Sequence, residues 1–236
     1  MNTGERDMDV IGERTDYVFG RSATAGGAGD PGRPTAVGVL HGIRASLAHV
    51  FGSPDLEGRT ALVQGAGWVG SVLAFWLAHA RAAVLVADVD PVRAQKVAAQ
   101  VSGDVVPPDE VVDAACDVYA PCAVGGVLSA ETARRLRCRI VAGSANNQLA
   151  KPEAADVLRG RGILYAPDYG INAGGAIALV GVEQLAWTTP EVDAALVRIG
   201  ETLPEIYARA DAAGVSTAAA ADALAEERLR PPDASL

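Results

Sequence analysis

The chain has 236 residues, half of them hydrophobic and only 5% aromatic, which is enough to bury one α/β core with a smaller appendage. A net charge of −9 and an isoelectric point near 4.8 argue against partners such as nucleic acid or anionic membranes, which need clustered Lys and Arg. The three cysteines lack the spacing of a metal site, and the sequence shows neither an apolar leader nor an apolar run of roughly 20 residues. We therefore predict a reduced, cytoplasmic protein without a metal site.

Residues 1–34 are polar and rich in Gly and Pro, which predicts an entry loop or linker. Asp7 and Asp9 within it look like acids at the start of a helix. A helix is expected next, with Thr35 or a neighbour as its cap, because apolar residues recur at helical spacing at Val39, Ile43, Leu47 and Val50.

From Arg59 onward, short apolar β-prone runs alternate with helical segments, which is typical of a parallel sheet with crossover helices. The runs are continuously apolar, as expected when helices cover both faces. We therefore predict an α/β fold, a doubly wound Rossmann domain over residues 35–187, followed by C-terminal helices and a short tail over 188–236. The expected strands are TALVQ, AVLVAD, CDVYA, RIVAG and GILYA, and the expected helix breaks are Thr188-Thr189-Pro190 and Gly214.

A glycine fingerprint follows the first of these strands and opens a helix. In such a motif the first glycine allows a tight turn, the second lets the backbone approach a pyrophosphate, and the third permits close helix–strand packing. The helix amino terminus then offers free N–H groups to the phosphates. The sequence therefore predicts a dinucleotide site at Gly65, Ala66, Gly67, Trp68, Val69 and Gly70.

Asp88 closes the next strand, eighteen residues beyond Gly70, where an acid would accept hydrogen bonds from the adenine ribose. This position favours NAD over NADP, because a 2′-phosphate would meet a carboxylate, and Asp90 strengthens the preference. Arg93 lies close enough in sequence to leave use of both cofactors open.

Six ordered blocks resemble the glutamate/leucine/phenylalanine/valine dehydrogenase family, and two of them, APC-x-x-GG and SANNQL, are more similar to the leucine and valine enzymes. The resemblance implies an NAD-dependent oxidoreductase that acts on a branched-chain or other apolar amino acid, its 2-oxo acid or an imine. The six blocks are DMDVIGERTDYV, LEGRTALVQGAGWVG, CDVYAPCAVGG, VAGSANNQL, YAPDYGINAGG and AADALAEERL.

The resemblance also implies roles for further residues. Two strand-end loops would contact the nicotinamide and its ribose, Thr35 would approach the nicotinamide amide, and Asn147 would face both cofactor and substrate. The loop residues are Ala120, Cys122, Ala123, Ala145 and Asn147, and the substrate side chain would meet Ala176 and Leu179.

Several of these residues have a purely structural alternative. Cys122 reads as a small buried hydrophobe, since nothing near it in sequence would lower its pKa. Asn146 and Asn147 could simply satisfy loop backbone groups, and Asp168 reads as a turn or cap residue. The three histidines lie in helical stretches and receive no role.

The family's catalytic lysines belong to an amino-terminal domain that the resemblance does not include, so residues 1–34 would be the remnant of that domain and a linker. Lys96 and Lys151 are the only lysines and read as surface charges, so we predict no catalytic residue within this chain. Three interpretations stay open: a fragment of a complete dehydrogenase, a short form that reduces an imine or works with a lysine-bearing partner chain, and a non-catalytic NAD-binding or regulatory protein. A homo-oligomer formed through an exposed apolar surface is also expected.

Overall fold

The computed structural model describes residues 3–230 and is built around one six-stranded parallel sheet. The strand order is β3-β2-β1-β4-β5-β6, so the chain starts in the middle of the sheet, moves to one edge, and then returns to build the other half. This order is that of the doubly wound fold, and it confirms the predicted fold class. The strands are β1 (Thr60–Gln64), β2 (Ala83–Ala87), β3 (Asp104–Val105), β4 (Val118–Pro121), β5 (Ile140–Val141) and β6 (Leu164–Tyr165).

Five of these strands overlap the predicted apolar runs, and β3 was missed. β3 has two exposed residues and pairs only with β2, so it carries neither the length nor the apolar pattern that a sequence reading needs. β1 pairs with β2 on one side and with β4 on the other. The point where the winding reverses therefore lies between β1 and β4.

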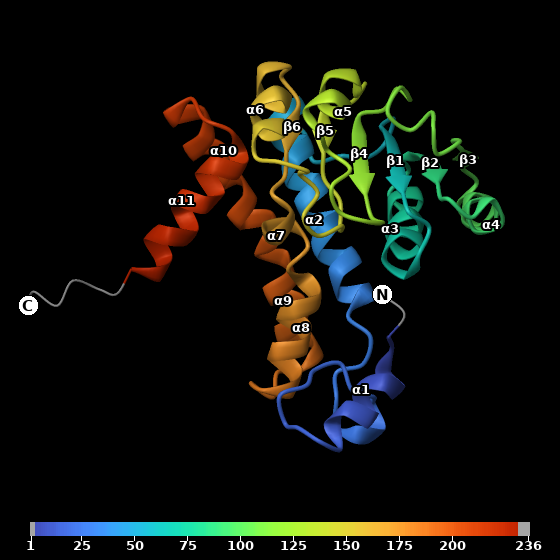
Figure 1. The fold of residues 1–236 in the computed structure, drawn as a ribbon, viewed down its shortest axis with the longest axis vertical. Helices are drawn as coiled ribbons and strands as arrows, with labels where there is room; N and C mark the ends of the chain where they lie inside the picture. Colours follow the sequence, from blue (N-terminus) through green and yellow to red (C-terminus); the bar gives the residue numbers. More distant parts are fainter. Residues whose placement is uncertain (1–2, 231–236) are drawn as a thin grey trace, which may run out of the picture.

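Helices cover both faces of the sheet, and successive residues of each central strand point into opposite cores. Along β1, Ala61 and Val63 enter a core with α2, α3, α4 and α10 (Ile199–Ala213), whereas Leu62 enters a second core with α5 and α6. Figure 1 shows α2 running along the sheet from the end where β1 and β4 finish toward the end where they begin. The helices are α2 (Gly32–Phe51), α3 (Trp68–His79), α4 (Pro91–Val101), α5 (Ala130–Arg135) and α6 (Glu153–Gly160).

The segment before α2 is more ordered than the predicted linker. It contains the helix α1 (Glu5–Gly12) and a short 3₁₀ turn at Ala23–Ala25. The Asp7 carboxylate accepts from the Gly4 backbone N–H at 2.7 Å, which confirms its role at a helix start, while Asp9 accepts from Ser22 instead.

Thr35 does not cap α2, which is a correction to the sequence analysis. The helix begins three residues earlier at Gly32, after Pro31, and the Thr35 hydroxyl donates to the Pro31 carbonyl at 2.7 Å. Proline is tolerated in the first helical turn because its missing N–H has no intrahelical partner there. Pro34 therefore did not mark the start of the helix.

The C-terminal part is helical, with α7 (Asp168–Ile171), α8 (Gly174–Glu183), α9 (Thr189–Val197), α10 (Ile199–Ala213) and α11 (Thr217–Leu229). Both predicted breaks are confirmed, since Thr188 precedes α9 and Gly214 ends α10 in a left-handed conformation. The tail PPDASL lies outside the described residues. Among residues 3–230, no helix has the length and apolar character needed to cross a bilayer.

Candidate functional site

A cleft of about 910 Å³ opens at the carboxyl edge of the sheet, where the loops after β1, β2, β4 and β5 meet. Open α/β sheets bind ligands at this edge, outside the point where the strand order reverses, and cofactor sites occupy roughly 300–1,000 Å³. Nine of the fifteen predicted site residues line the cleft: Gly65, Gly67, Trp68, Val69, Asp88, Cys122, Ala123, Ala145 and Asn147.

The three glycines of the fingerprint have three different local surroundings. Gly65 has φ +104°, and an added Cβ would lie 2.8 Å from the Ala123 backbone nitrogen, so the turn needs a residue without a side chain. A Cβ on Gly70 would lie 1.8 Å from the Gly65 carbonyl oxygen, because α3 packs directly against the turn. A Cβ on Gly67 would meet nothing within 4 Å. Gly67 thus faces open space in the cleft, whereas Gly65 and Gly70 are required by the protein's own packing.

The amino end of α3 points into this space with backbone donors available. Gly67 precedes the helix and provides no side-chain cap, and the first intrahelical bond runs from Ser71 N–H to the Gly67 carbonyl at 2.9 Å. The amides of Trp68, Val69 and Gly70 belong to the first turn, where a helix has no internal acceptors for them. Such an end attracts an anionic group through its N–H groups and its positive dipole.

Asp88 reaches the glycine turn, but its carboxylate is already engaged within the protein. One oxygen accepts from Ala66 N–H at 2.7 Å and the other from Asp90 N–H at 2.9 Å. Arg93 lies 3.7 Å from the same carboxylate, which is only 6% exposed. Asp88 therefore holds the turn in place and also lines the cleft, and its contact with a ribose stays a prediction.

The loops after β4 and β5 form the opposite wall and are joined by backbone hydrogen bonds. Gly126 N–H donates to the Asn147 carbonyl at 2.7 Å, and Leu128 N–H donates to the Gln148 carbonyl at 3.0 Å. Asn147 has φ +52°, a left-handed conformation that asparagine tolerates better than most residues. A Cβ on Gly125 would lie 2.5 Å from the Asn146 carbonyl oxygen, so the two loops lie in direct contact.

A hydrogen-bond network that the sequence analysis did not anticipate fixes the loop after β5. The fully buried Gln148 side chain donates to the carbonyls of Gly143 and Ala145 at 2.9 and 3.0 Å. Its backbone N–H donates to the Asp168 carboxylate at 2.8 Å. Asn172 donates to the side-chain oxygen of Asn146 at 2.6 Å.

The predicted turn role of Asp168 is therefore incomplete. Besides receiving a hydrogen bond from the adjacent Tyr169 N–H at 2.7 Å, Asp168 ties α7 to the cleft wall. No pattern within one segment could have revealed bonds to a residue twenty positions away.

Six predicted site residues do not line the cleft. Ala66 and Gly70 are buried inside the turn, and Ala120 is fully buried within β4, where its side chain joins the core. Thr35 lies where α2 meets α8, and Ala176 and Leu179 are on α8, with Leu179 near Gly20 of the N-terminal segment. A Cβ on Gly175 would be 2.5 Å from the Thr35 hydroxyl, which puts Ala176 beside Thr35.

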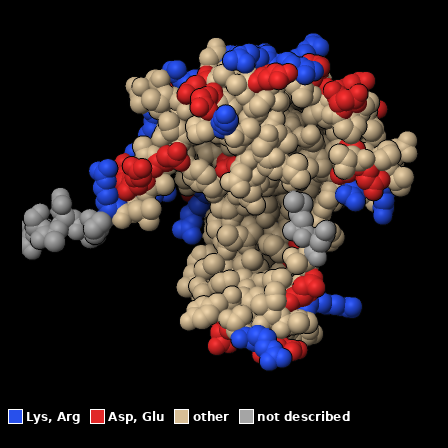
Figure 2. Space-filling view, viewed as in Figure 1, with Lys and Arg blue, Asp and Glu red and all other residues tan. Residues whose placement is uncertain are grey.

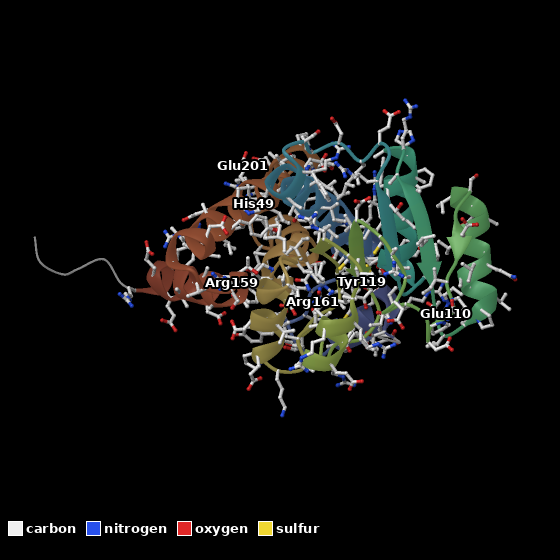
Figure 3. All side chains as sticks on the ribbon, turned by 90° about the horizontal axis from the view of Figure 1, so that it is seen from above. His49, Glu110, Tyr119, Arg159, Arg161 and Glu201 are labelled. Atoms are coloured by element: carbon white, nitrogen blue, oxygen red, sulfur yellow. The ribbon has the colours of Figure 1, made fainter. Side chains whose placement is uncertain are left out.

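Other candidate groups show no sign of catalytic activation. Burial raises the pKa of the Cys122 thiol, which fits the interpretation as a small buried hydrophobe. Lys96 and Lys151 are exposed and are not part of the cleft lining. The His49 imidazole lies 3.4 Å from the Asp211 carboxylate. Figure 3 views the molecule from the end where the strands begin and shows His49 away from the sheet. Within residues 3–230, no three His, Cys, Asp or Glu side chains gather as a metal site would require.

Comparison with known proteins places residues 86–231 in the profile of the family described as Glutamate/Leucine/Phenylalanine/Valine dehydrogenase. A leucine dehydrogenase of Thermoactinomyces intermedius is 38% identical over 229 residues, which are 97% of this chain and 62% of that protein. A valine dehydrogenase of Streptomyces albus is 42% identical over 226 residues, which are 94% of this chain and 62% of that protein.

Solved structures agree with these matches. The L-tryptophan dehydrogenase of Nostoc punctiforme superposes with a TM-score of 0.81 at 38% identity, covering 84% of this chain and 60% of that one. The hetero-hexameric glutamate dehydrogenase of Thermus thermophilus gives a TM-score of 0.77 at 26% identity, covering 97% and 61%. The chain therefore spans about three fifths of the length of the relatives that it matches.

Proposed function

This chain belongs to the glutamate/leucine/phenylalanine/valine dehydrogenase family, and we propose that it binds NAD in the cleft as the nucleotide-binding part of an amino-acid dehydrogenase. One observation carries the proposal. The open space at Gly67 and the unbonded first turn of α3 face the same cleft, at the reversal point of the sheet. A pyrophosphate needs both close backbone approach and N–H donors.

The remaining lining residues fit the other parts of a dinucleotide. Asp88 and Arg93 lie at the β2 end of the cleft, where the adenine ribose would bind. The wall formed by Cys122, Ala123 and Asn147 lies on the β4 and β5 side, where the nicotinamide half would bind. When bound, NAD supplies the ring carbon that accepts or donates a hydride. The chain's own contribution is to hold and orient that ring and to exclude water around it.

The choice of NAD over NADP rests on the Asp88 carboxylate, which would repel a 2′-phosphate. Its engagement with Ala66 keeps the charge in place, and Arg93, 52% exposed, is the nearby cation that could attract the phosphate. We expect calorimetric titration to give at least tenfold tighter binding of NAD⁺ than of NADP⁺. Arg93→Ala should widen the preference, and Arg44→Ala on α2 serves as a matched control outside the cleft. Equal affinity for both cofactors would refute the assignment.

We assign the substrate to the apolar amino acids and their 2-oxo acids or imines, with Asn147, Ala176 and Leu179 as contacts. Ala176 and Leu179 are one turn apart on α8, and Thr35 contacts Gly175 of the same helix. A small residue at 176 leaves room for an apolar side chain. Ala176→Leu should lower activity toward bulky substrates before it affects NAD⁺ affinity.

Turnover is a separate part of the proposal, because Lys96 and Lys151 lie outside the cleft lining. The test follows NADH absorbance in two directions: its rise with leucine or valine at a saturating NAD⁺ concentration, and its fall with preformed cyclic imines at a saturating NADH concentration. Oxidation of leucine or valine supports the dehydrogenase. Reduction of imines alone supports the imine-reducing alternative, and saturable binding without any turnover supports the non-catalytic alternative.

Self-association through apolar surface is also part of the proposal. Figure 2 shows charges of both signs interspersed over the visible face, with a largely uncharged waist below the sheet. The exposed apolar side chains of α8 and the following turn include Val180, Val182 and Leu185. Light scattering that gives a monomer mass at working concentration would exclude this association.

A further inference from the structure

Trp68 is an aromatic residue at the position of the fingerprint where the cleft and α3 meet. It is the first residue of α3, it lines the cleft, and 63% of it is exposed. A large apolar side chain with that much exposure is not held there by burial in the core. Its position therefore requires another explanation.

The ring of Trp68 rests on the first residue of α2. A Cβ built on Gly32 would lie 1.9 Å from Trp68 Cδ1 and 2.5 Å from Nε1, so the indole occupies the space that any other residue at position 32 would need. Gly32 is buried, and its N–H donates to the Asp30 carboxylate at 2.6 Å. Only glycine at 32 and a flat ring at 68 allow this close contact.

The contact joins the two helices at their amino ends. α2 and α3 are sequence neighbours separated by β1, and Figure 1 shows both beginning near the end of the sheet where β1 finishes. Thr35 lies one turn beyond Gly32 on α2, and its hydroxyl contacts Gly175 of α8. A continuous path of contacts therefore runs from the glycine turn, through Trp68 and Gly32, to the α2–α8 junction.

We propose that Trp68 is a positioning residue, which fixes the glycine-rich turn against the amino end of α2 and so sets the distance between the pyrophosphate and nicotinamide subsites. The ligand part of this inference rests on the proposed NAD binding, whereas the contact with Gly32 does not. Because helices are stiff, holding α2 at Gly32 also holds Thr35. Loss of the ring would allow the amino end of α2 to open locally.

Hydrogen–deuterium exchange of the ligand-free protein tests the contact directly. Trp68→Ala should increase exchange in peptides covering residues 32–36, and Trp68→Phe should give an intermediate effect because it keeps a flat ring. Trp76→Phe is the matched control, since Trp76 lies on the same helix but packs against Phe75 and His79. Unchanged exchange at 32–36 in Trp68→Ala would overturn the proposal, whatever the protein binds.

Titration with NAD⁺ and with AMP tests the positioning role. AMP would occupy the Asp88 end of the cleft and reach neither Thr35 nor α8. We expect Trp68→Ala and Gly32→Ala to weaken NAD⁺ binding about tenfold, or about 1.4 kcal/mol, and AMP binding less than twofold. Equal weakening of both ligands, or of neither, would refute it. If the wild-type chain bound no NAD⁺, the proposed function would fail, and exchange at 32–36 would still decide whether Trp68 holds α2.

Discussion

Substituting Gly67 or Gly70 with alanine should separate the glycine required by a ligand from the glycine required by the fold. The two positions are three residues apart in the same turn of chain. The structure nevertheless gives them opposite surroundings, since a Cβ at 67 meets open space and a Cβ at 70 lies 1.8 Å from the Gly65 carbonyl oxygen.

For Gly70→Ala, backbone lies on both sides of the clash, so no flexible side chain can move away. Overpacking of this kind costs about 1–3 kcal/mol, and alanine's higher helix propensity recovers less than about 1 kcal/mol at this first-turn position. A net loss of about 2 kcal/mol lowers the melting temperature by roughly 4–8 °C in a chain of this size.

For Gly67→Ala, φ −72° and ψ −166° are accessible to alanine, and stability should change by less than about 1 kcal/mol, because alanine restricts the unfolded chain but is a poorer N-cap for α3 than glycine. Binding of NAD⁺ should weaken at least tenfold, because the new methyl group enters the space that the pyrophosphate needs.

The assay pairs thermal unfolding with calorimetric titration of NAD⁺ for the two variants. Gly160→Ala is the control, since a Cβ at 160 also meets nothing within 4 Å and lies at the end of α6, away from the cleft. The reasoning is refuted if Gly67→Ala keeps wild-type NAD⁺ affinity, or if it destabilises the protein as much as Gly70→Ala does.

Three further predictions concern the supports of the site. Gln148→Leu removes two buried hydrogen bonds and should lower the free energy of unfolding by about 2 kcal/mol, while the exposed Gln100→Leu should change it little in a denaturant titration. Glu183 accepts from Gly20 and Ala28, so Glu183→Ala should speed tryptic cleavage before α2, whereas the exposed Glu226→Ala should not. Burial raises the pKa of all three cysteine thiols, so thiolate should be scarce at pH 8 in the folded protein, and reaction with a thiol reagent should become fast only on unfolding; rapid native labelling would contradict this.

The parts of the fold that the sequence predicted are those determined by local patterns. Strand, turn and helix around Gly65–Gly70 are adjacent in the chain, and their spacing alone fixes the geometry of the turn. The breaks at Thr188 and Gly214 likewise follow from residues that cap or end helices themselves. β3 was missed because it consists of only two exposed residues and pairs with a single strand, so it lacks the apolar run that marks a buried strand in a sequence.

The parts that the sequence did not predict depend on contacts between distant segments. The hydrogen bond that Asp88 accepts from Ala66, twenty-two residues earlier, was not predicted, and its contact with a ribose stays a prediction. Thr35 or a neighbour was expected to cap the helix because apolar residues recur at helical spacing after it, yet the helix starts at Gly32, where Trp68 of another helix lies on the glycine. Local sequence patterns identify which residues lie near the cleft. They cannot identify which of those residues hydrogen-bond or pack against one another.

The two walls of the cleft are held in different ways, and this difference determines how each can respond to a ligand. On the β5 side, Gln148, Asp168 and Asn172 form directional hydrogen bonds, two of them from a fully buried amide, so a displacement there would leave buried polar groups unpaired. On the glycine-turn side, Asp88 accepts from Ala66 N–H, and the exposed ring of Trp68 rests on Gly32 at the buried start of α2. The ring of Trp68 is therefore the more exposed of the supports, and its removal should change the position of the glycine turn while the wall after β5 stays in place.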